Sequence, residues 1–176
     1  MPGFVIHLAV AYEYIRKHKG EIKNKEKFFE GILAPDFKED KYKSHYGNYH
    51  LDHIGIKNFV DVNDIDISSD FGKGYFLHLI TDEAFYNNYF SSETEYIRKN
   101  NIGFYDDYNY TNGELIEYFK IDYIPIEAKT YIKIQNGSPK ILDIKKVIHF
   151  IEGLSKVSLE EQEKNIKLEN KVLFDL

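Results

Sequence analysis

The sequence predicts a single all-α domain spanning residues 1–176, a multi-helix bundle arranged around one central, metal-carrying helix. Three observations lead to this prediction. Apolar residues recur at helical spacing in several segments, capping residues precede those segments, and alternating strand patterns are scarce. A chain of 176 residues, 43% of them apolar, also buries enough surface to fold as one compact unit. We expect about five or six helices and little strand.

The first helix is expected over residues 4–17, where Phe4, Leu8 and Ile15 lie at helical spacing. His7 falls inside this apolar segment. A lone histidine in such a place is usually a hydrogen-bonded core residue, and metal ligation is the alternative.

A second helix is expected after Asn24, a good N-cap residue. Pro35 is expected to end it, because proline lacks an N–H group and disfavours helix at the preceding residue. Asp36 would then lie in the turn just beyond the helix. The apolar residues of this helix are Phe28, Phe29, Ile32 and Leu33.

Residues 38–69 are rich in His, Tyr, Asp and Gly and are expected to form loops with short helical turns. Residues 70–90 then predict a helix that is apolar on nearly every side, which is typical of a central position. This helix nevertheless carries His78 and Asp82, four residues apart and therefore on one face. Burying Asp82 there is costly unless a cation or hydrogen-bond donors satisfy it.

The pattern between residues 100 and 142 is the hardest to interpret. Residues 111–119 indicate a short helix, and the alternation over residues 130–135 before Asn136-Gly137 suggests a small β-hairpin insertion. Asp143 can cap a helix with a clear apolar stripe over residues 144–154. Ser158 with Glu161 forms a capping-box pattern for a last helix.

Composition narrows the chemistry. The chain has no Cys, so any metal must be held by His and carboxylate groups, which suit zinc, manganese or iron. A net charge of −6 argues against stable binding of duplex DNA. The N-terminus lacks the basic flank and long apolar run of a signal peptide, and no apolar stretch is long enough to span a bilayer. We therefore expect a cytoplasmic protein, and its oligomeric state stays open.

Four short motifs occur in order along residues 1–90, and in this order they resemble the zinc-dependent phospholipase C-like family, which belongs with the single-strand-specific zinc nucleases. The motifs are Pro2-Gly3-Phe4-Val5-x-His7, Gly31-x-x-Ala34-Pro35-Asp36, Ser44-His45 and Gly74-Tyr75-x-x-His78-Leu79-x-x-Asp82. The resemblance implies an all-α fold in which Asp36, His45, His78 and Asp82 hold one zinc ion. His7 would hold a second ion, with Asp82 as the bridge.

The family's third metal lacks its ligands in this chain. Tyr86 and its neighbours stand where the resemblance requires a histidine, and the nearest C-terminal pair is His149 with Glu152, three residues apart. One or two ions are therefore expected, with zinc as the first choice and manganese or iron as alternatives.

The resulting hypothesis is a metal-dependent hydrolase that acts on a phosphodiester or phosphomonoester through metal-activated water. Asp36 is the candidate to orient or deprotonate that water. The substrate would be a phosphate-containing small molecule, a lipid or a nucleotide. Its binding residues are expected among Lys41, Lys43, His50 and His53.

Two alternatives were weighed against the hydrolase. An HD-domain phosphohydrolase is also all-α, but it needs a His-Asp step, and the chain contains only the reverse order at Asp52-His53. A catalytically degenerate, metal-stabilised helical binding domain is the other alternative. A deciding observation is whether His7, His45 and His78 converge.

Overall fold

The computed structural model describes residues 2–47, 55–89, 105–168 and 171–174. These residues form helices and contain no strand, which confirms the predicted all-α class. The helical elements are α1 (Phe4–Lys17), α2 (Lys25–Phe37), α3 (Lys41–Ser44), α4 (Ile56–Val62), α5 (Asp70–Ala84), the π-helix η1 (Phe85–Tyr89), α7 (Tyr105–Tyr118), α8 (Ile126–Lys129), α9 (Ile144–Leu154) and α10 (Leu159–Lys167).

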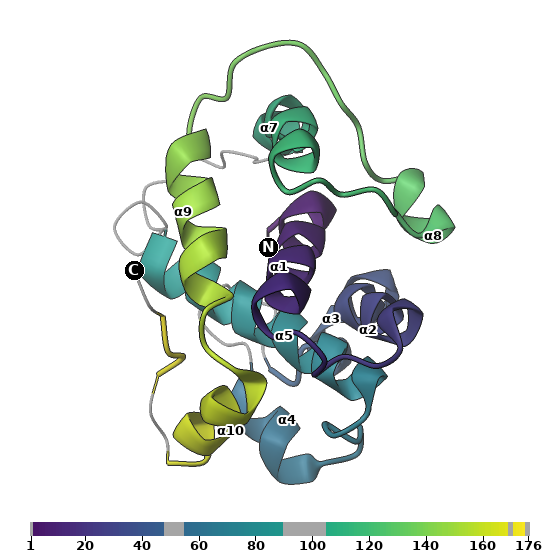
Figure 1. Ribbon diagram of the computed structural model, residues 1–176, viewed down its shortest axis with the longest axis vertical. Coiled ribbons are helices and arrows are strands. Elements are labelled where there is room, and N and C mark those ends of the chain that lie inside the picture. The colour runs from purple at the N-terminus through teal and green to yellow at the C-terminus, as the bar shows by residue number, and fades with distance from the viewer. Residues whose placement is uncertain (1, 48–54, 90–104, 169–170, 175–176) are drawn as a thin grey trace.

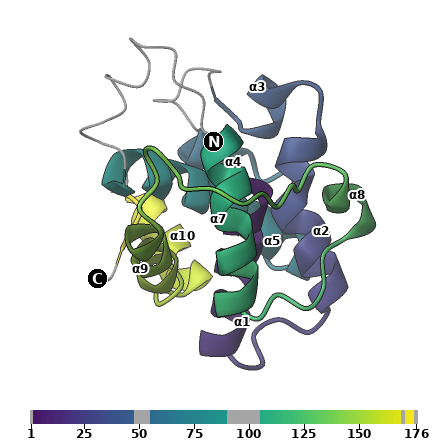
Figure 2. The ribbon, with the colours of Figure 1, turned by 90° about the horizontal axis from the view of Figure 1, so that it is seen from above.

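Helix α5 lies at the centre of the domain (Figure 1). It contacts α1, α2, α4 and α10, and 11 of its 15 residues are buried. Its N-terminus is capped by Ser69, whose side chain accepts a hydrogen bond from the N–H of Gly72. Viewed from above, α7 lies over α1 (Figure 2), and these two helices are also in contact. The predicted central helix is therefore confirmed.

Two glycines bring α2 and α5 unusually close together. A Cβ atom on Gly31 would lie 2.0 Å from the carbonyl oxygen of Phe71, and one on Gly74 would lie 2.1 Å from the carbonyl oxygen of Phe28. Any larger residue at either position would clash with the backbone of the other helix. This close approach packs the middle of α2 against the first half of α5.

The predicted end of the second helix is wrong by two residues. Pro35 lies inside α2, which continues to Phe37, so Asp36 belongs to the last helical turn and not to the turn beyond it. Proline costs a single backbone hydrogen bond in this position, and the final turn still closes through a bond from the N–H of Lys38 to the carbonyl of Pro35 at 3.4 Å.

The predicted hairpin around Asn136-Gly137 is also wrong, because residues 130–142 form no strand. Their backbone groups bond to α7 instead of to each other. Buried Asp107 accepts hydrogen bonds from the N–H groups of Lys140, Ile141 and Leu142 at 2.7–3.1 Å. The helix that supplies this carboxylate begins at Tyr105, six residues before the predicted start.

The remaining helices agree with the sequence. Asn24 caps α2 by accepting from the N–H of Lys27, and Asp143 caps α9 by accepting from Lys145 and Lys146. Ser158 caps α10 by accepting from the N–H of Glu161. Six of the α-helices in the described part of the chain have nine residues or more, as expected, and the other three are single turns or little longer.

Candidate metal centre

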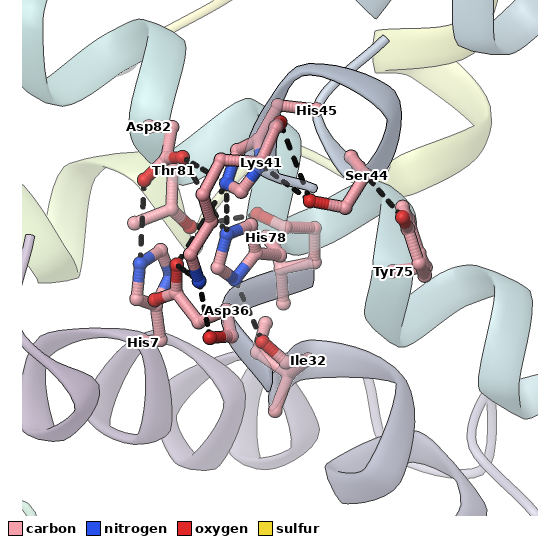
Figure 3. A network of polar contacts seen from close by, with 11 residues as sticks. His7, Ile32, Asp36, Lys41, Ser44, His45, Tyr75, His78, Thr81 and Asp82 are labelled. Atoms are coloured by element: carbon pink, nitrogen blue, oxygen red, sulfur yellow. Dashed lines mark hydrogen bonds and ion pairs between the residues drawn. The ribbon is translucent and has the colours of Figure 1, made fainter. Parts of the chain in front are cut away.

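Five side chains from separate segments converge on one buried point (Figure 3). His7 comes from α1, Asp36 from the last turn of α2, and His45 from the residue that follows α3; His78 and Asp82 come from α5. Their ligand atoms form two overlapping groups in which all atoms lie within 4.8 Å of one another: His7, Asp36 and His78, and His45, His78 and Asp82. The structure thus brings together all five residues that the sequence singled out as metal ligands.

Asp82 is the common partner of the three histidines. Its Oδ1 lies 3.3 Å from His7 Nε2, and its Oδ2 lies 3.3 Å from His45 Nε2 and 3.4 Å from His78 Nε2. The Nε2 atoms of His45 and His78 are 3.2 Å apart. Ligands that share a tetrahedral ion at bond lengths of about 2.0–2.1 Å are separated by about 3.3–3.4 Å. The atoms of His45, His78 and Asp82 match that spacing.

The main chain fixes which nitrogen of His45 and His78 faces the centre. Nδ1 of His78 is 2.8 Å from the carbonyl oxygen of Ile32, and Nδ1 of His45 is 3.0 Å from that of Lys41. A carbonyl oxygen only accepts hydrogen bonds, so Nδ1 carries the proton in both rings. Each Nε2 therefore presents its lone pair to the centre, the arrangement that metal-binding histidines normally have.

Most of the unsatisfied buried polar atoms of the described residues lie in this cluster. Leaving such an atom without a hydrogen bond costs about 1–3 kcal/mol, so a group of them calls for an explanation. A cation bound among them would satisfy the nitrogen and oxygen lone pairs together. The atoms are His7 Nδ1 and Nε2, Asp36 Oδ1, Asp82 Oδ1 and Oδ2, and, outside the cluster, Tyr86 Oη.

The charges of the cluster shift the pKa values of its members. Burial raises the pKa of Asp82, but the charge of His78 and the close approach of the other imidazoles outweigh burial and hold this pKa well below its ordinary value. Burial lowers the pKa of His78, yet the carboxylates of Asp82 and Asp36 raise it above 6.5. The pKa of His7 is lowered, first by burial and then by His78. In the absence of a cation, a proton therefore prefers His78 to His7.

The cluster is closed on most sides. His7, His78 and Asp82 have no exposed surface, and His45 is 5% exposed. The side chains of Asp36 and His45 are 6% and 7% exposed. Lys41 lies beside Asp36, with its side chain 30% exposed and its Nζ 3.5 Å from Asp36 Oδ1. A partly exposed ammonium therefore borders the buried centre next to Asp36.

Of the other predicted substrate-binding residues, Lys43 does not join the cluster. Lys43 is 82% exposed at its side chain and pairs with Asp40 at 3.7 Å. His50 and His53 lie outside the described residues.

The candidates for a third metal do not join the cluster either. His149 is exposed on α9, and Glu152 accepts a hydrogen bond from the hydroxyl of Tyr118 at 3.0 Å. Tyr86 is buried, and its hydroxyl has no hydrogen-bond partner. Among the described residues, neither group that could hold a metal ion contains His149 or Glu152.

An aromatic trio lies next to two of the ligands, a feature that the sequence analysis missed. The ring of Phe4 stacks on those of Phe37 and Tyr131, at centroid distances of 5.4 and 5.3 Å. Phe4 is one helical turn before His7 and Phe37 directly follows Asp36, so these two positions could have been found from the ligands. Tyr131 gave no such signal, because its contact depends on the path of residues 119–131.

A groove of about 580 Å³ runs along the exposed side of α2, between that helix and residues 123–129. None of the five clustered residues lines it. Phe37 is the link between this groove and the aromatic trio.

Comparisons with protein-family models, with curated proteins and with solved structures gave no match for this chain. Among the described residues, no helix is long and apolar enough to cross a bilayer. Interpretation of the centre therefore depends on its geometry and on the ordered motifs of residues 1–90.

Proposed function

We propose that the protein is a metal-dependent hydrolase that cleaves a phosphoester through activated water, with zinc as the first candidate for the cation. The observation that supports this most directly is the convergence of three imidazoles and two carboxylates, among which buried atoms of His7, Asp36 and Asp82 have no hydrogen-bond partner. Three His with one or two carboxylates is a ligand set that suits zinc, and manganese and iron accept it as well. The ordered motifs of residues 1–90 support the same reading.

In this proposal the clustered residues have different roles. His7, His45, His78 and Asp82 would hold the cation, since their ligand atoms are buried and directed to one point. When bound, a divalent cation supplies Lewis-acid chemistry, lowering the pKa of water from about 15.7 to about 7 and polarising a phosphoryl oxygen.

Asp36 would touch the cation and also accept the proton of the attacking water, because it is the carboxylate beside the partly exposed Lys41. The water oxygen forms a bond to phosphorus, the bond from phosphorus to the leaving oxygen breaks, and Asp36 takes the proton. The ammonium of Lys41, which lies beside Asp36, would balance the charge of the phosphate.

The substrate class is proposed as a phosphodiester or phosphomonoester of a small molecule, a lipid or a nucleotide. Lys41 lies beside Asp36, and two members of the aromatic trio, Phe4 and Phe37, are close in sequence to the ligands His7 and Asp36. A cation and an ammonium favour an anionic ester, whereas the rings favour an apolar or planar leaving group.

A metal-stabilised binding domain is the second candidate. The burial of His7, His78 and Asp82 favours it, because structural zinc sites are closed whereas catalytic ones keep a position open. The two candidates predict the same bound metal and differ in turnover.

The test is a metal analysis of protein purified without added metal, followed by assays of bis-p-nitrophenyl phosphate and p-nitrophenyl phosphate. Bound zinc with turnover that is lost in Asp36→Asn supports the hydrolase. Bound zinc without turnover on either ester favours the binding domain. Protein that takes up no zinc, manganese or iron even after dialysis against each ion would refute both candidates.

A further inference from the structure

The two overlapping groups of ligands cannot each hold an ion of their own, because both include His78. The Nδ1 atom of this ring is occupied by the carbonyl of Ile32 at 2.8 Å. Only Nε2 remains, and an imidazole nitrogen has one lone pair to donate. The two groups therefore describe alternative selections from one set of ligands around one cation.

The charges of the centre also indicate a single cation. Asp36 and Asp82 bring two negative charges into a buried site, and the three histidines serve as ligands in their neutral form. One divalent cation already balances those two charges. A second divalent cation beside the ammonium of Lys41 would leave three positive charges in excess in a region shielded from water, which is costly, and removal of the ammonium lowers that excess.

A positive charge already occupies the remaining side of the centre. The Nζ atom of Lys41 lies 3.5 Å from Asp36 Oδ1 and also donates a hydrogen bond to the carbonyl oxygen of Asp36. Figure 3 shows the Lys41 side chain reaching down beside His45, with its ammonium next to Asp36. A second cation bound by Asp36, His7 and the Oδ1 atom of Asp82 would have to share Asp36 with this ammonium.

We propose that the centre holds a single divalent cation and that the ammonium of Lys41 takes the place of a second one beside Asp36. This inference rests on the proposed metal centre and adds its stoichiometry and the reason for it. Removing the ammonium frees Asp36 from its ion pair. His7 and Asp36 then remain for another ion, with Asp82 Oδ1, which lies 3.3 Å from His7 Nε2, as the third ligand, and three protein ligands are enough for a metal site.

Lys41→Met is the variant that tests the role of the ammonium. It keeps most of the length of the side chain and removes its charge. It also leaves the orientation of His45 intact, because the main-chain carbonyl of Lys41, not its side chain, accepts from His45 Nδ1. Lys41→Arg keeps a cation at the same place. Lys43→Met is the matched control, since Lys43 lies in the same short helix and pairs with Asp40.

The experiment is equilibrium dialysis of the full chain against excess zinc, followed by elemental analysis of zinc per chain. Zinc bound to the Asp82→Asn variant is subtracted, because it measures ions held elsewhere on the surface. We expect one zinc in the wild type, in Lys41→Arg and in Lys43→Met, and two in Lys41→Met. Circular dichroism verifies that each variant is folded.

Two zinc ions in the wild type would overturn the proposal with no need for a variant, while leaving the proposed hydrolase intact. One zinc in folded Lys41→Met, bound with unchanged affinity, would also overturn it, because the ammonium would then have no influence on cation binding. No zinc in the wild type would instead refute the proposed metal centre itself. The stoichiometry of the wild type remains decisive if Lys41→Met fails to fold.

Discussion

The Nε2 atoms of His45 and His78 face each other at 3.2 Å, although the Nδ1 atom of each ring is held by a main-chain carbonyl. In this tautomer both Nε2 atoms present lone pairs, and two lone pairs at that distance repel each other. A proton or a metal ion between them removes the repulsion. The two rings are therefore arranged to accept a cation between their Nε2 atoms. This relationship underlies the first two predictions.

Asp82→Asn is expected to abolish zinc binding. The carboxylate lies 3.3–3.4 Å from all three Nε2 atoms, and the amide that replaces it is neutral and has only one acceptor oxygen. We expect a loss in affinity well above the roughly 10–100-fold that removal of an outer partner of a ligand causes, measured by competition with a chromophoric chelator. Asp40→Asn, an exposed change in the nearby cap of α3, is the control and should bind zinc normally. Equal affinity in the wild type and in Asp82→Asn would contradict the assignment of the centre.

Zinc is expected to bind more tightly as the pH rises from 6 to 8. The pKa of His78 is raised above 6.5 in the folded protein, so its proton stabilises the metal-free fold below pH 6.5. That stabilisation is lost as the pH rises through the folded pKa. Zinc must displace this proton, so its affinity grows until the proton has left.

The measurement for this prediction is the shift in melting temperature caused by a fixed excess of zinc at pH 6, 7 and 8. The shift should be smallest at pH 6. At a zinc concentration 100 times Kd, bound ligand adds about 2.7 kcal/mol to the free energy of unfolding. A shift that is constant over this range would argue against a histidine-based site.

Gly74→Ala is expected to lower the free energy of unfolding and to weaken zinc binding. The new methyl group would lie 2.1 Å from the carbonyl oxygen of Phe28, so α2 and α5 would have to separate. Overpacking of this kind costs about 1–3 kcal/mol. Because α2 supplies Asp36 and the carbonyl that orients His78, zinc affinity should fall as well.

Gly113→Ala is the control for that substitution. Gly113 lies inside α7, and its added methyl group would meet only a side-chain carbon of exposed Ile134 at 3.2 Å. We expect no loss of stability, since alanine is the better helix former. Urea denaturation compares the two variants, and similar losses in both would show that the contact between α2 and α5 is not special.

The sequence predicted the helices well where local signals were complete. Residues 144–154 carry a capping Asp143 and a full apolar stripe, and the helix was found with its bounds. Residues 105–110, by contrast, are polar and aromatic with little periodicity, so the start of α7 was missed. The predicted end of α2 at Pro35 was wrong because a proline in the final turn removes only one backbone hydrogen bond.

The candidate site was predictable in its residue types and not in its arrangement. The ordered motifs pointed to the five residues, but nothing local shows that the ring of His7 stacks on that of His78 at a centroid distance of 3.9 Å. Lys41 and Lys43 could not be told apart either, since they are two residues apart in a short segment. Which of them faces Asp36 follows from the direction of α3, which tertiary contacts determine.

Asp107→Asn is expected to destabilise the protein without affecting zinc binding. The carboxylate accepts three main-chain N–H bonds from residues 140–142, and the amide nitrogen of asparagine would face donors instead of accepting from them. Hydrogen bonds to a charged group contribute about 1.5–3 kcal/mol each, so the loss should be readily visible in urea denaturation.

Asp106→Asn is the matched control for Asp107→Asn. Asp106 is the exposed neighbour on the same helix turn, and its substitution should leave the denaturation midpoint nearly unchanged. If both variants unfold at the wild-type midpoint, the attachment of residues 140–142 to α7 contributes little to stability.

The acceptors that orient His45 and His78 belong to the peptide backbone, at Lys41 and Ile32. Substitution of a side chain does not remove a backbone carbonyl. Both rings can therefore keep their orientation while the side chains around them change during evolution. Position 41, whose side chain is 30% exposed, can therefore change in charge without loss of the carbonyl that orients His45.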